Sequence, residues 1–392
     1  MADDFLGSVA QEDVRFITEI VKTVNPGDNF KHLVVYTDHS QIVDTSLLAA
    51  VKDYDGNVVA HFAEVSANDF RNVVKEELLV WLTDYFTAGG NETVFVVDVE
   101  DEDAPYSKAR LQAAYAMTRQ KGWFKSICIA DAAVSGMFHL DPDAAKDLAE
   151  LCSTDELLSS APLYPESMAL VEGAHADTAR LAVDAAGFDA FWVYHMPALQ
   201  ADGVTYVVHN GAMVALGIAL SAVNGSGTYA GNSFDMVATS AITPSGVGGG
   251  SLSPTVQGIL KSTNTSYFKY VGDTTGDVDL RGGLTSKGEL MAAKWLQNFC
   301  NYYNKVMVAR YLSQRNIVKS PTTYSVLLSI LTTTVSKFTD AGSGRLTQYA
   351  LTAPAYADLP SADKDAIVVP NAWHATYQDD VRTVDVYGTL YI

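Results

Sequence analysis

The chain has 392 residues, with 26 Lys or Arg against 46 Asp or Glu, so its formal net charge is −20. This balance argues against a nucleic-acid-binding protein and against one held at an anionic membrane surface, because both need a basic field. Hydrophobic residues make up 48% of the chain, which excludes wholesale disorder, and the length predicts more than one domain.

The sequence also indicates no membrane insertion, because it lacks a stretch of about 18 uninterrupted apolar residues. Its first residues, Met1-Ala2-Asp3-Asp4, are acidic where a secretion signal is basic, which predicts synthesis in a cytoplasm. The three cysteines are odd in number and far apart, so neither a disulfide framework nor cysteine chemistry is expected at Cys128, Cys152 and Cys300.

The first half of the chain alternates predicted helices and strands. Residues 1–27 are predicted as an arm followed by a helix, and residues 31–36 as a short buried strand. Helix–turn–strand units in this order are typical of an α/β domain. The further helices are predicted at residues 69–86, 107–120, 142–152 and 174–186, and the further strands at residues 93–99, 126–130 and 191–194.

The second half begins with a shift in composition. Residues 224–276 are rich in Gly, Ser, Thr and Asn, which predicts loop or extended structure and a hinge or insertion boundary. Amphipathic helices are then predicted at residues 289–310 and 324–338. Strands are predicted at residues 346–352, 366–370 and 381–392. The fold class is therefore α/β (α+β), multi-domain, with mixed sheets flanked by helices.

The sequence contains only weak matches to known catalytic and ligand-binding motifs. The glycine cluster at residues 246–250 lacks the lysine of a phosphate-binding loop and is interpreted as a flexible loop. Acidic runs at residues 98–103 and 272–279 offer oxygen ligands but not the spacing of a calcium loop, so solvated faces are favoured. The eight histidines form no HExxH or HxH motif, and no GxSxG motif occurs. We therefore predict no catalytic residue, no metal and no cofactor.

The alternating segment from residue 381 onward predicts a strand whose backbone groups need partners. Two interpretations stay open: an edge strand of its own domain, or a strand donated to a neighbouring subunit. Donation in a head-to-tail contact generates rings or helical tubes. Under the second interpretation the inter-subunit strand comprises Val384, Val386, Tyr387, Leu390, Tyr391 and Ile392.

Taken in order, several segments resemble the tail sheath proteins of contractile bacteriophages and related injection systems. Val74–Phe86 resembles the family's helix before a small glycine turn, and Gly89–Val99 resembles the glycine pair and hydrophobic strand that follow. Trp123–Ala130 is similar to the strand after the next helix. Leu327–Phe338, with Gly344-Arg345-Leu346 and the extended residues 384–392, looks like the sheath assembly domain.

The resemblance implies a structural virion protein and no enzyme. Six copies form a ring around an inner tail tube, rings stack helically, and contraction drives the tube through the host envelope. The implied partners are other copies of the chain, the tail tube protein, and baseplate and tail terminator proteins, with no direct nucleic acid contact. The implied location is the virion tail, after synthesis in the host bacterial cytoplasm. The alternatives are another tail component (baseplate, tube or adaptor) and an α/β enzyme with an unreadable site.

The resemblance also suggests a division of the chain and extended terminal arms for strand exchange between subunits. Residues 1–27 form the N-terminal arm and helix, and residues 28–105 form part of the assembly α/β domain. Residues 106–250 form a middle α/β domain or insertion, and residues 251–392 form a C-terminal assembly domain that ends in the donated strand.

Overall fold

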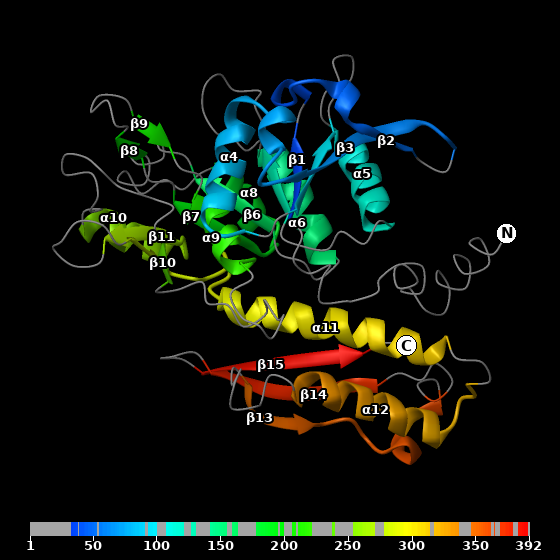
Figure 1. Ribbon diagram of the computed structural model, residues 1–392. Coiled ribbons are helices and arrows are strands. Elements are labelled where there is room, and N and C mark those ends of the chain that lie inside the picture. Colours follow the sequence, from blue (N-terminus) through cyan, green and yellow to red (C-terminus); the bar gives the residue numbers. More distant parts are fainter. Residues whose placement is uncertain are drawn as a thin grey trace. The chain divides into compact units, whose positions relative to one another are not determined.

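The computed structural model (Figure 1) contains both helices and strands, and its largest sheet is mixed, which confirms the expected α/β (α+β) class. The arm and helix expected at residues 1–27 lie outside the described residues. The structure describes residues 33–37, 39–52, 55–90, 93–99, 107–120, 127–130, 142–154, 159–163, 178–194, 197–199, 206–208, 211–221, 237–239, 254–270, 278–313, 317–336, 346–361, 364, 369–378 and 383–390.

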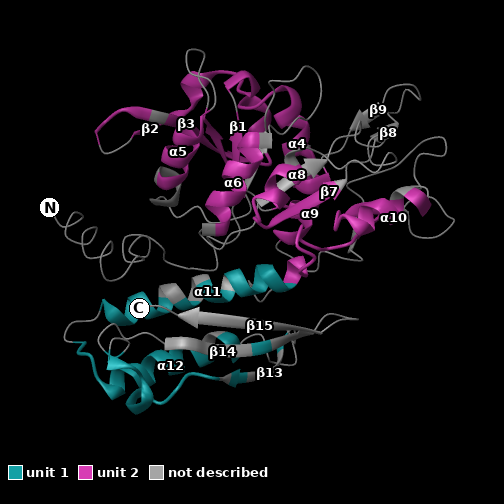
Figure 2. Cartoon of the chain, turned by 180° about the vertical axis from the view of Figure 1, so that it is seen from behind, with its two compact units in different colours: residues 1–29, 120–122, 293–392 teal, residues 30–119, 123–292 magenta. Residues whose placement is uncertain are grey.

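The chain forms two compact units (Figure 2). Unit 1 comprises residues 1–29, 120–122 and 293–392, and unit 2 comprises residues 30–119 and 123–292. Two of the expected boundaries, after residues 105 and 250, do not coincide with this division. Strands on both sides of residue 105 belong to one sheet, and the chain from residue 251 to residue 292 belongs to unit 2. Both differences arise because strands that are distant in the sequence pair with one another, and composition does not reveal such pairing.

Unit 2 is built on a seven-stranded sheet with the order β2-β3-β4-β1-β5-β6-β7. The neighbouring strands β4, β1, β5, β6 and β7 run parallel to one another. Strands β3 and β2 extend the sheet beyond β4, and each runs antiparallel to its neighbour. The strands are β1 (Leu33–Thr37), β2 (Ala49–Lys52), β3 (Val58–Ser66), β4 (Thr93–Asp98), β5 (Ile127–Ala130), β6 (Ser159–Leu163) and β7 (Ala190–Tyr194).

Continuous apolar sequences form the middle of this sheet. Every residue of β1 is buried, and β4 is buried from Val94 to Asp98. Strands covered on both faces have this composition, whereas half-exposed strands alternate. The register pairs Leu33 with Val94 and Thr37 with Asp98, so β1 and β4 end together.

The helices α5, α6 and α8 connect successive parallel strands, and α4 lies between β3 and β4 in the longer connection from β1 to β4. Because the order of the strands reverses after β4, right-handed crossovers place α4 on one face and α5, α6 and α8 on the other. Accordingly α4 packs against α9, while α6 packs against α8 and is tied to α5 by ion pairs of Lys108. The helices are α4 (Glu76–Thr87), α5 (Lys108–Gln120), α6 (Pro142–Thr154), α8 (Thr178–Ala185) and α9 (Gly211–Ala219).

The α4 helix begins later than the helix predicted at residues 69–86. The residues before α4 form the short 3-10 helix η3 (Phe70–Asn72), followed by a segment that pairs with residues 41–43. The Lys75 N–H donates to the Gln41 carbonyl at 2.8 Å, and the Gln41 side chain accepts from the Leu78 N–H at 3.0 Å. Gln41 therefore caps the first turn and fixes the start of the helix.

The segment predicted as loop or extended structure at residues 224–276 contains a helix, so that prediction is wrong over α10 (Pro254–Ser262). Pro254 fits the first turn and Leu260 is buried, which gives this helix a start and an anchor despite its polar composition. Two small antiparallel sheets complete unit 2: β10 (Val237–Thr239), β12 (Val278–Arg281) and β11 (Tyr267–Tyr270), and β8 (Pro197–Leu199) with β9 (Tyr206–Val208).

The described part of unit 1 contains two helices and an antiparallel sheet with the order β13-β14-β15. The helices predicted at residues 289–310 and 324–338 are confirmed, with slightly different ends. The helix α12 packs on β13, β14 and the 3-10 turn η5. The elements are α11 (Met291–Leu312, in unit 1 from Ala293), α12 (Pro321–Ser336), β13 (Leu346–Leu351), η5 (Tyr356–Asp358), β14 (Val369–Gln378) and β15 (Thr383–Leu390).

No helix within the described residues is both long enough and apolar enough to cross a membrane.

The contact between α9 and α4 in unit 2 depends on a glycine. A Cβ atom at Gly217 of α9 would lie 2.4 Å from the Tyr85 carbonyl oxygen and 2.7 Å from the Ala88 Cβ atom. Backbone of α4 cannot give way cheaply, so Gly217→Ala should lower the free energy of unfolding by about 1–3 kcal/mol. Urea unfolding followed by circular dichroism measures this effect.

Gly258, inside α10, provides a matched control because a Cβ atom there meets nothing within 4 Å. Gly258→Ala should raise the free energy of unfolding by about 0.5–1 kcal/mol through helix propensity. Equal effects of the two substitutions would contradict the packing argument.

Candidate functional site

The strand β15 lies at one edge of its sheet. It pairs antiparallel with β14 from Gln378↔Thr383 to Trp373↔Gly388, and Val369 pairs with Leu390 after a shift in register. No strand in the described part of the chain pairs with the opposite side of β15. An edge of this kind presents a row of N–H and C=O groups to which another strand can add.

The structure describes four of the six residues predicted to form the inter-subunit strand. Val384 pairs with Tyr377, Val386 with Ala375, Tyr387 with His374 and Leu390 with Val369. Tyr391 and Ile392 lie outside the described residues. The first interpretation, an edge strand of its own domain, therefore describes the single chain, and donation to a second subunit stays a prediction.

The helix α12 supports this sheet from one side. Its buried face consists of residues at helical spacing, with Leu327, Leu331 and Val335 all at 0% exposure. The Tyr324 hydroxyl donates to the Pro354 carbonyl at 2.8 Å, and burial raises the pKa of this tyrosine. The helix α12 and the loop after β13 are therefore joined by a hydrogen bond, and the helix packs on the sheet.

The seven-stranded sheet of unit 2 has one edge at β7 and the other at β2. The β7 edge is closed by two segments from far along the chain. The Ser266 N–H donates to the Trp192 carbonyl at 2.8 Å, and the Ser286 N–H donates to the Ala190 carbonyl at 2.8 Å. Bridges join Val193 to Ser266 and Phe191 to Thr285.

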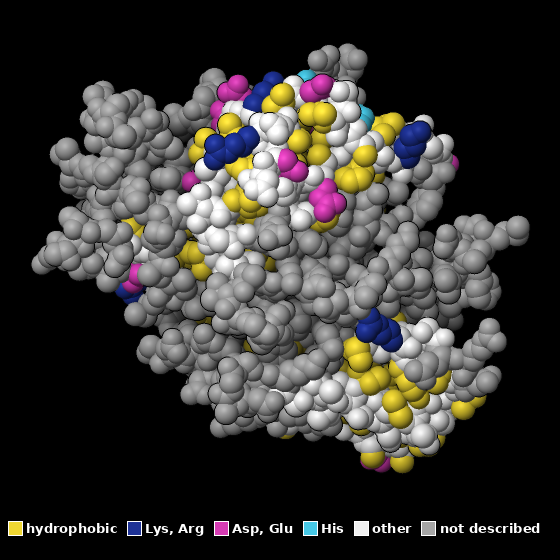
Figure 3. Space-filling view, viewed as in Figure 1, with side chains coloured by type: hydrophobic (Ala, Val, Ile, Leu, Met, Phe, Trp, Pro, Cys, Tyr) yellow, Lys and Arg dark blue, Asp and Glu magenta, His cyan; other side chains and the backbone are white. Residues whose placement is uncertain are grey.

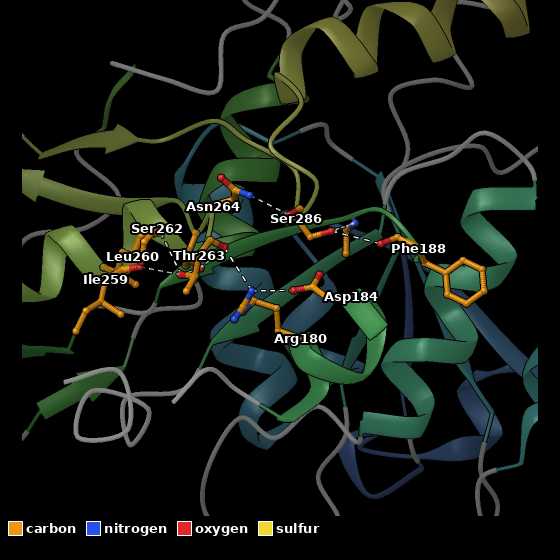
Figure 4. Close-up of polar contacts among 11 residues, drawn as sticks. Arg180, Asp184, Phe188, Ile259, Leu260, Ser262, Thr263, Asn264 and Ser286 are labelled. Atoms are coloured by element: carbon orange, nitrogen blue, oxygen red, sulfur yellow. Dashed lines mark hydrogen bonds and ion pairs between the residues drawn. The ribbon is translucent and has the colours of Figure 1, made fainter. Parts of the chain in front are cut away.

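A polar cluster holds these two segments against β7 (Figure 4). The Arg180 guanidinium bonds the Asp184 carboxylate at 2.8 Å and reaches the Thr263 carbonyl at 3.5 Å. The Asn264 side chain donates to the Ser286 carbonyl at 3.0 Å, and the Ser286 hydroxyl accepts from the Ala190 N–H at 3.2 Å. We call Arg180, Asp184, Thr263, Asn264 and Ser286 the edge-closing cluster.

The electrostatics of the edge-closing cluster centre on Asp184. Burial raises the pKa of this carboxyl above its ordinary value, the nearby Asp189 adds to the rise, and Arg180 and the Ser286 hydroxyl oppose it. Arg180 is itself buried at 7% exposure. A buried cation with this set of carbonyl and carboxylate acceptors has a structural role, because its charge is already neutralised.

A second candidate location is the carboxyl edge of the parallel strands, where the order reverses between β4, β1 and β5. Ligands of open α/β sheets bind at such a point. Thr37, Asp98 and His61 occupy one row of the register across β1, β4 and β3. The Thr37 hydroxyl is buried and has no hydrogen-bond partner among the described residues. Arg110 of α5 donates from Nε to the Val99 carbonyl at 3.0 Å, so it stabilises the end of β4.

The acidic and histidine candidates do not assemble into a metal site within the described residues, where no group of three His, Cys, Asp or Glu side chains could hold an ion. Of the run at residues 98–103, only Asp98 and Val99 are described. Of the run at residues 272–279, Asp279 is described, and it pairs with Arg281 at 2.9 Å. The glycine cluster at residues 246–250 lies outside the described residues.

No protein-family model matches this chain, and no curated protein matches its sequence.

The edge-closing cluster was not predicted from the sequence. The spacing of Arg180 and Asp184 is an i, i+4 pair on a helix, a signal that sequence reading can find. Ser286 is about a hundred positions from Asp184, and only the fold brings the two together. The same is true of the open β2 edge, because Ala49 and Ala50 have low strand propensity and give no signal.

Asp184 should give unfolding a defined pH dependence. Because the pKa is raised in the folded state, the carboxyl contributes stability that is present below its ordinary pKa, about 3.9, and is lost as the pH rises through the raised value. We therefore expect the free energy of unfolding of wild type, relative to that of Asp184→Asn, to be higher at about pH 4 than at about pH 7. Urea unfolding of both proteins at the two pH values measures this difference. A difference between the two proteins that stays constant with pH would contradict this assignment.

Proposed function

We propose that this chain is a tail sheath subunit, a structural protein that polymerises around the inner tube of a contractile phage tail or related injection system. The observation that carries the proposal is the open edge of β15. A strand that is anchored to β14 on one side and open on the other can join a neighbouring subunit without unfolding its own unit. The ordered sequence resemblance supplies the kind of assembly.

The division into two units supports the same proposal. Unit 1 carries the open β15 edge, and unit 2 carries a large sheet with a separate core. A subunit whose linking strand and main body are different compact units can change contacts between copies while each unit keeps its packing. In the proposed mechanism, rings in the extended tail repack into a tighter lattice, and many small gains per subunit add up to the work of driving the tube.

The acidic charge fits assembly through backbone pairing. With a net charge of −20, copies repel one another over most of their surface. Strand addition brings hydrogen bonds between uncharged groups, and β15 contains one charged residue, Asp385, in eight positions. The other tail components remain the alternative within the same class, and an α/β enzyme using the row of Thr37, Asp98 and His61 is the alternative from another class.

Removal of residues 384–392 tests the proposal. The truncated chain should keep most of its helical circular dichroism, because α12 and the whole of unit 2 do not depend on this strand, but it should fail to pellet as polymer under conditions in which wild type pellets. Ultracentrifugation at matched concentrations measures the polymer fraction. Normal polymer from the truncated chain would contradict strand donation.

Proline substitution separates the two sides of β15. On an antiparallel edge strand, successive residues point their N–H groups alternately toward the partner strand and away from it. Asp385→Pro and Val386→Pro therefore remove one inward and one outward N–H. One variant should lose stability, and the other should keep the wild-type unfolding midpoint yet lose at least about tenfold in polymerisation. If the stable variant assembles like wild type, the outward edge is not used.

A further inference from the structure

One face of the large sheet in unit 2 changes from apolar to polar at its carboxyl edge. The register joins β1, β4 and β3 in rows, and the side chains of one row lie on the same face because the pleats of paired strands align. Two apolar rows are followed by one polar row. The rows are Leu33, Val94 and Val65; then Val35, Val96 and Ala63; then Thr37, Asp98 and His61.

Two members of the polar row are buried although they end their strands. Thr37 is 1% exposed and Asp98 is 2% exposed. The Thr37 hydroxyl has no hydrogen-bond partner among the described residues. Valine has nearly the same shape and favours strands at least as well, so packing alone does not require a hydroxyl here. A buried hydroxyl without a protein partner indicates a bound water molecule or ion.

The backbone beside this pair is held in place by hydrogen bonds. The Val99 N–H donates to the Thr37 carbonyl at 2.9 Å, so β4 stays attached to β1 beyond Asp98. Arg110, near the start of α5, donates from Nε to the Val99 carbonyl at 3.0 Å. Thr37 is also β-branched, which restricts its χ1 angle. Ligands carried by strands that are fixed in this way are preorganised.

A hydroxyl and a carboxylate on neighbouring strands suit a small divalent cation. Paired strands lie about 4.8 Å apart, and Mg²⁺ binds oxygen atoms at about 2.1 Å, so one ion is within reach of both side chains. Mg²⁺ keeps several water molecules and takes only one or two carboxylates from a protein. A Ser or Thr hydroxyl together with an Asp holds Mg²⁺ in P-loop nucleotide hydrolases, which shows that this ligand pair is sufficient.

The location and the charge of the chain also favour a cation. The polar row lies where the strand order reverses, and open α/β sheets bind their ligands at such a point. The net charge of −20 attracts cations and repels anions. Figure 3 shows acidic side chains in magenta and histidine in cyan on the surface at the top of unit 2, the part that contains β1, β2 and β3 in Figure 1.

We propose that Thr37 and Asp98 bind a divalent metal ion of the Mg²⁺ type at the carboxyl edge of β1 and β4. The Thr37 hydroxyl oxygen and one Asp98 carboxylate oxygen are direct ligands, and water molecules complete the coordination. His61, one strand further from Thr37, is the group in the row that can accept a hydrogen bond from a metal-bound water. The site uses residues of unit 2 alone, so it does not rest on the proposed function.

Metal binding should stabilise the folded wild-type chain, because an ion held by β1 and β4 has no such site in the unfolded chain. Thermal unfolding is followed by circular dichroism at constant ionic strength. About 10 mM MgCl₂ should raise the unfolding midpoint by about 3–5 °C if the dissociation constant is about 1 mM. Mn²⁺, which favours the same oxygen ligands, serves as the probe for direct titration by electron paramagnetic resonance.

Three substitutions at the two ligands test their roles. Thr37→Val removes the hydroxyl and Asp98→Asn removes the charge, and each should weaken Mn²⁺ binding at least about tenfold and abolish the Mg²⁺ shift. Thr37→Ser keeps the hydroxyl and should bind Mn²⁺ within about threefold of wild type. Without metal, Thr37→Val should unfold at or above the wild-type midpoint, because it removes an unbonded buried hydroxyl.

Asp358→Asn provides the charge control, since it removes one exposed carboxylate from η5 in unit 1 and should leave Mn²⁺ binding unchanged. Loss of binding in Thr37→Val with retention in Thr37→Ser and Asp358→Asn supports the site. Equal binding by wild type and Thr37→Val, which is expected of ions scattered over an acidic surface, overturns it. Wild type that neither binds Mn²⁺ nor responds to Mg²⁺ also overturns it. Polymerisation is measured separately, so these outcomes leave the proposed function untouched.

Discussion

The structure depends on how the edges of its open sheets are satisfied. Every backbone N–H and C=O group at an edge needs a partner, and an open sheet always has two edges. In the seven-stranded sheet, β7 receives its partners from Ser266 and Ser286, which arrive from distant parts of the chain. The edge at β2 and the outer side of β15 receive none from the described residues. The proposed assembly uses the outer side of β15 to join neighbouring copies.

The remaining packing in unit 2 holds the large sheet in shape. Gly217 lets α9 approach the backbone of α4, which covers one face of the parallel strands with helices in close contact. The edge-closing cluster then keeps the segments after α10 against β7 (Figure 4). The large sheet is therefore fixed by helix packing on its face and by these polar contacts at its β7 edge.

Sequence patterns predicted the parts of the fold that depend on local periodicity. The helices α5 and α6 and the strand β4 follow apolar spacing and glycine turns, and they were predicted to within a few residues. The helix α10 was missed because its segment is rich in Gly, Ser and Thr, and tertiary burial of Leu260 outweighs that composition. The sequence predicted the strand at β15 but left its pairing open, since register and partner are long-range properties. The β2 edge gave no local signal at all, because alanine does not favour strands.

Negative-stain electron microscopy of the purified wild-type chain at high concentration, alone and with added tail tubes, tests the central claim most directly. The account predicts hollow tubes or stacked six-fold rings, formed by the chain alone or templated on the tubes. Small uniform particles in both samples, with no coating on the tubes, would contradict assembly through the open edges. In that case the carboxyl edge of the parallel strands, with Thr37, Asp98 and His61 in one row, becomes the part of the molecule to test for function.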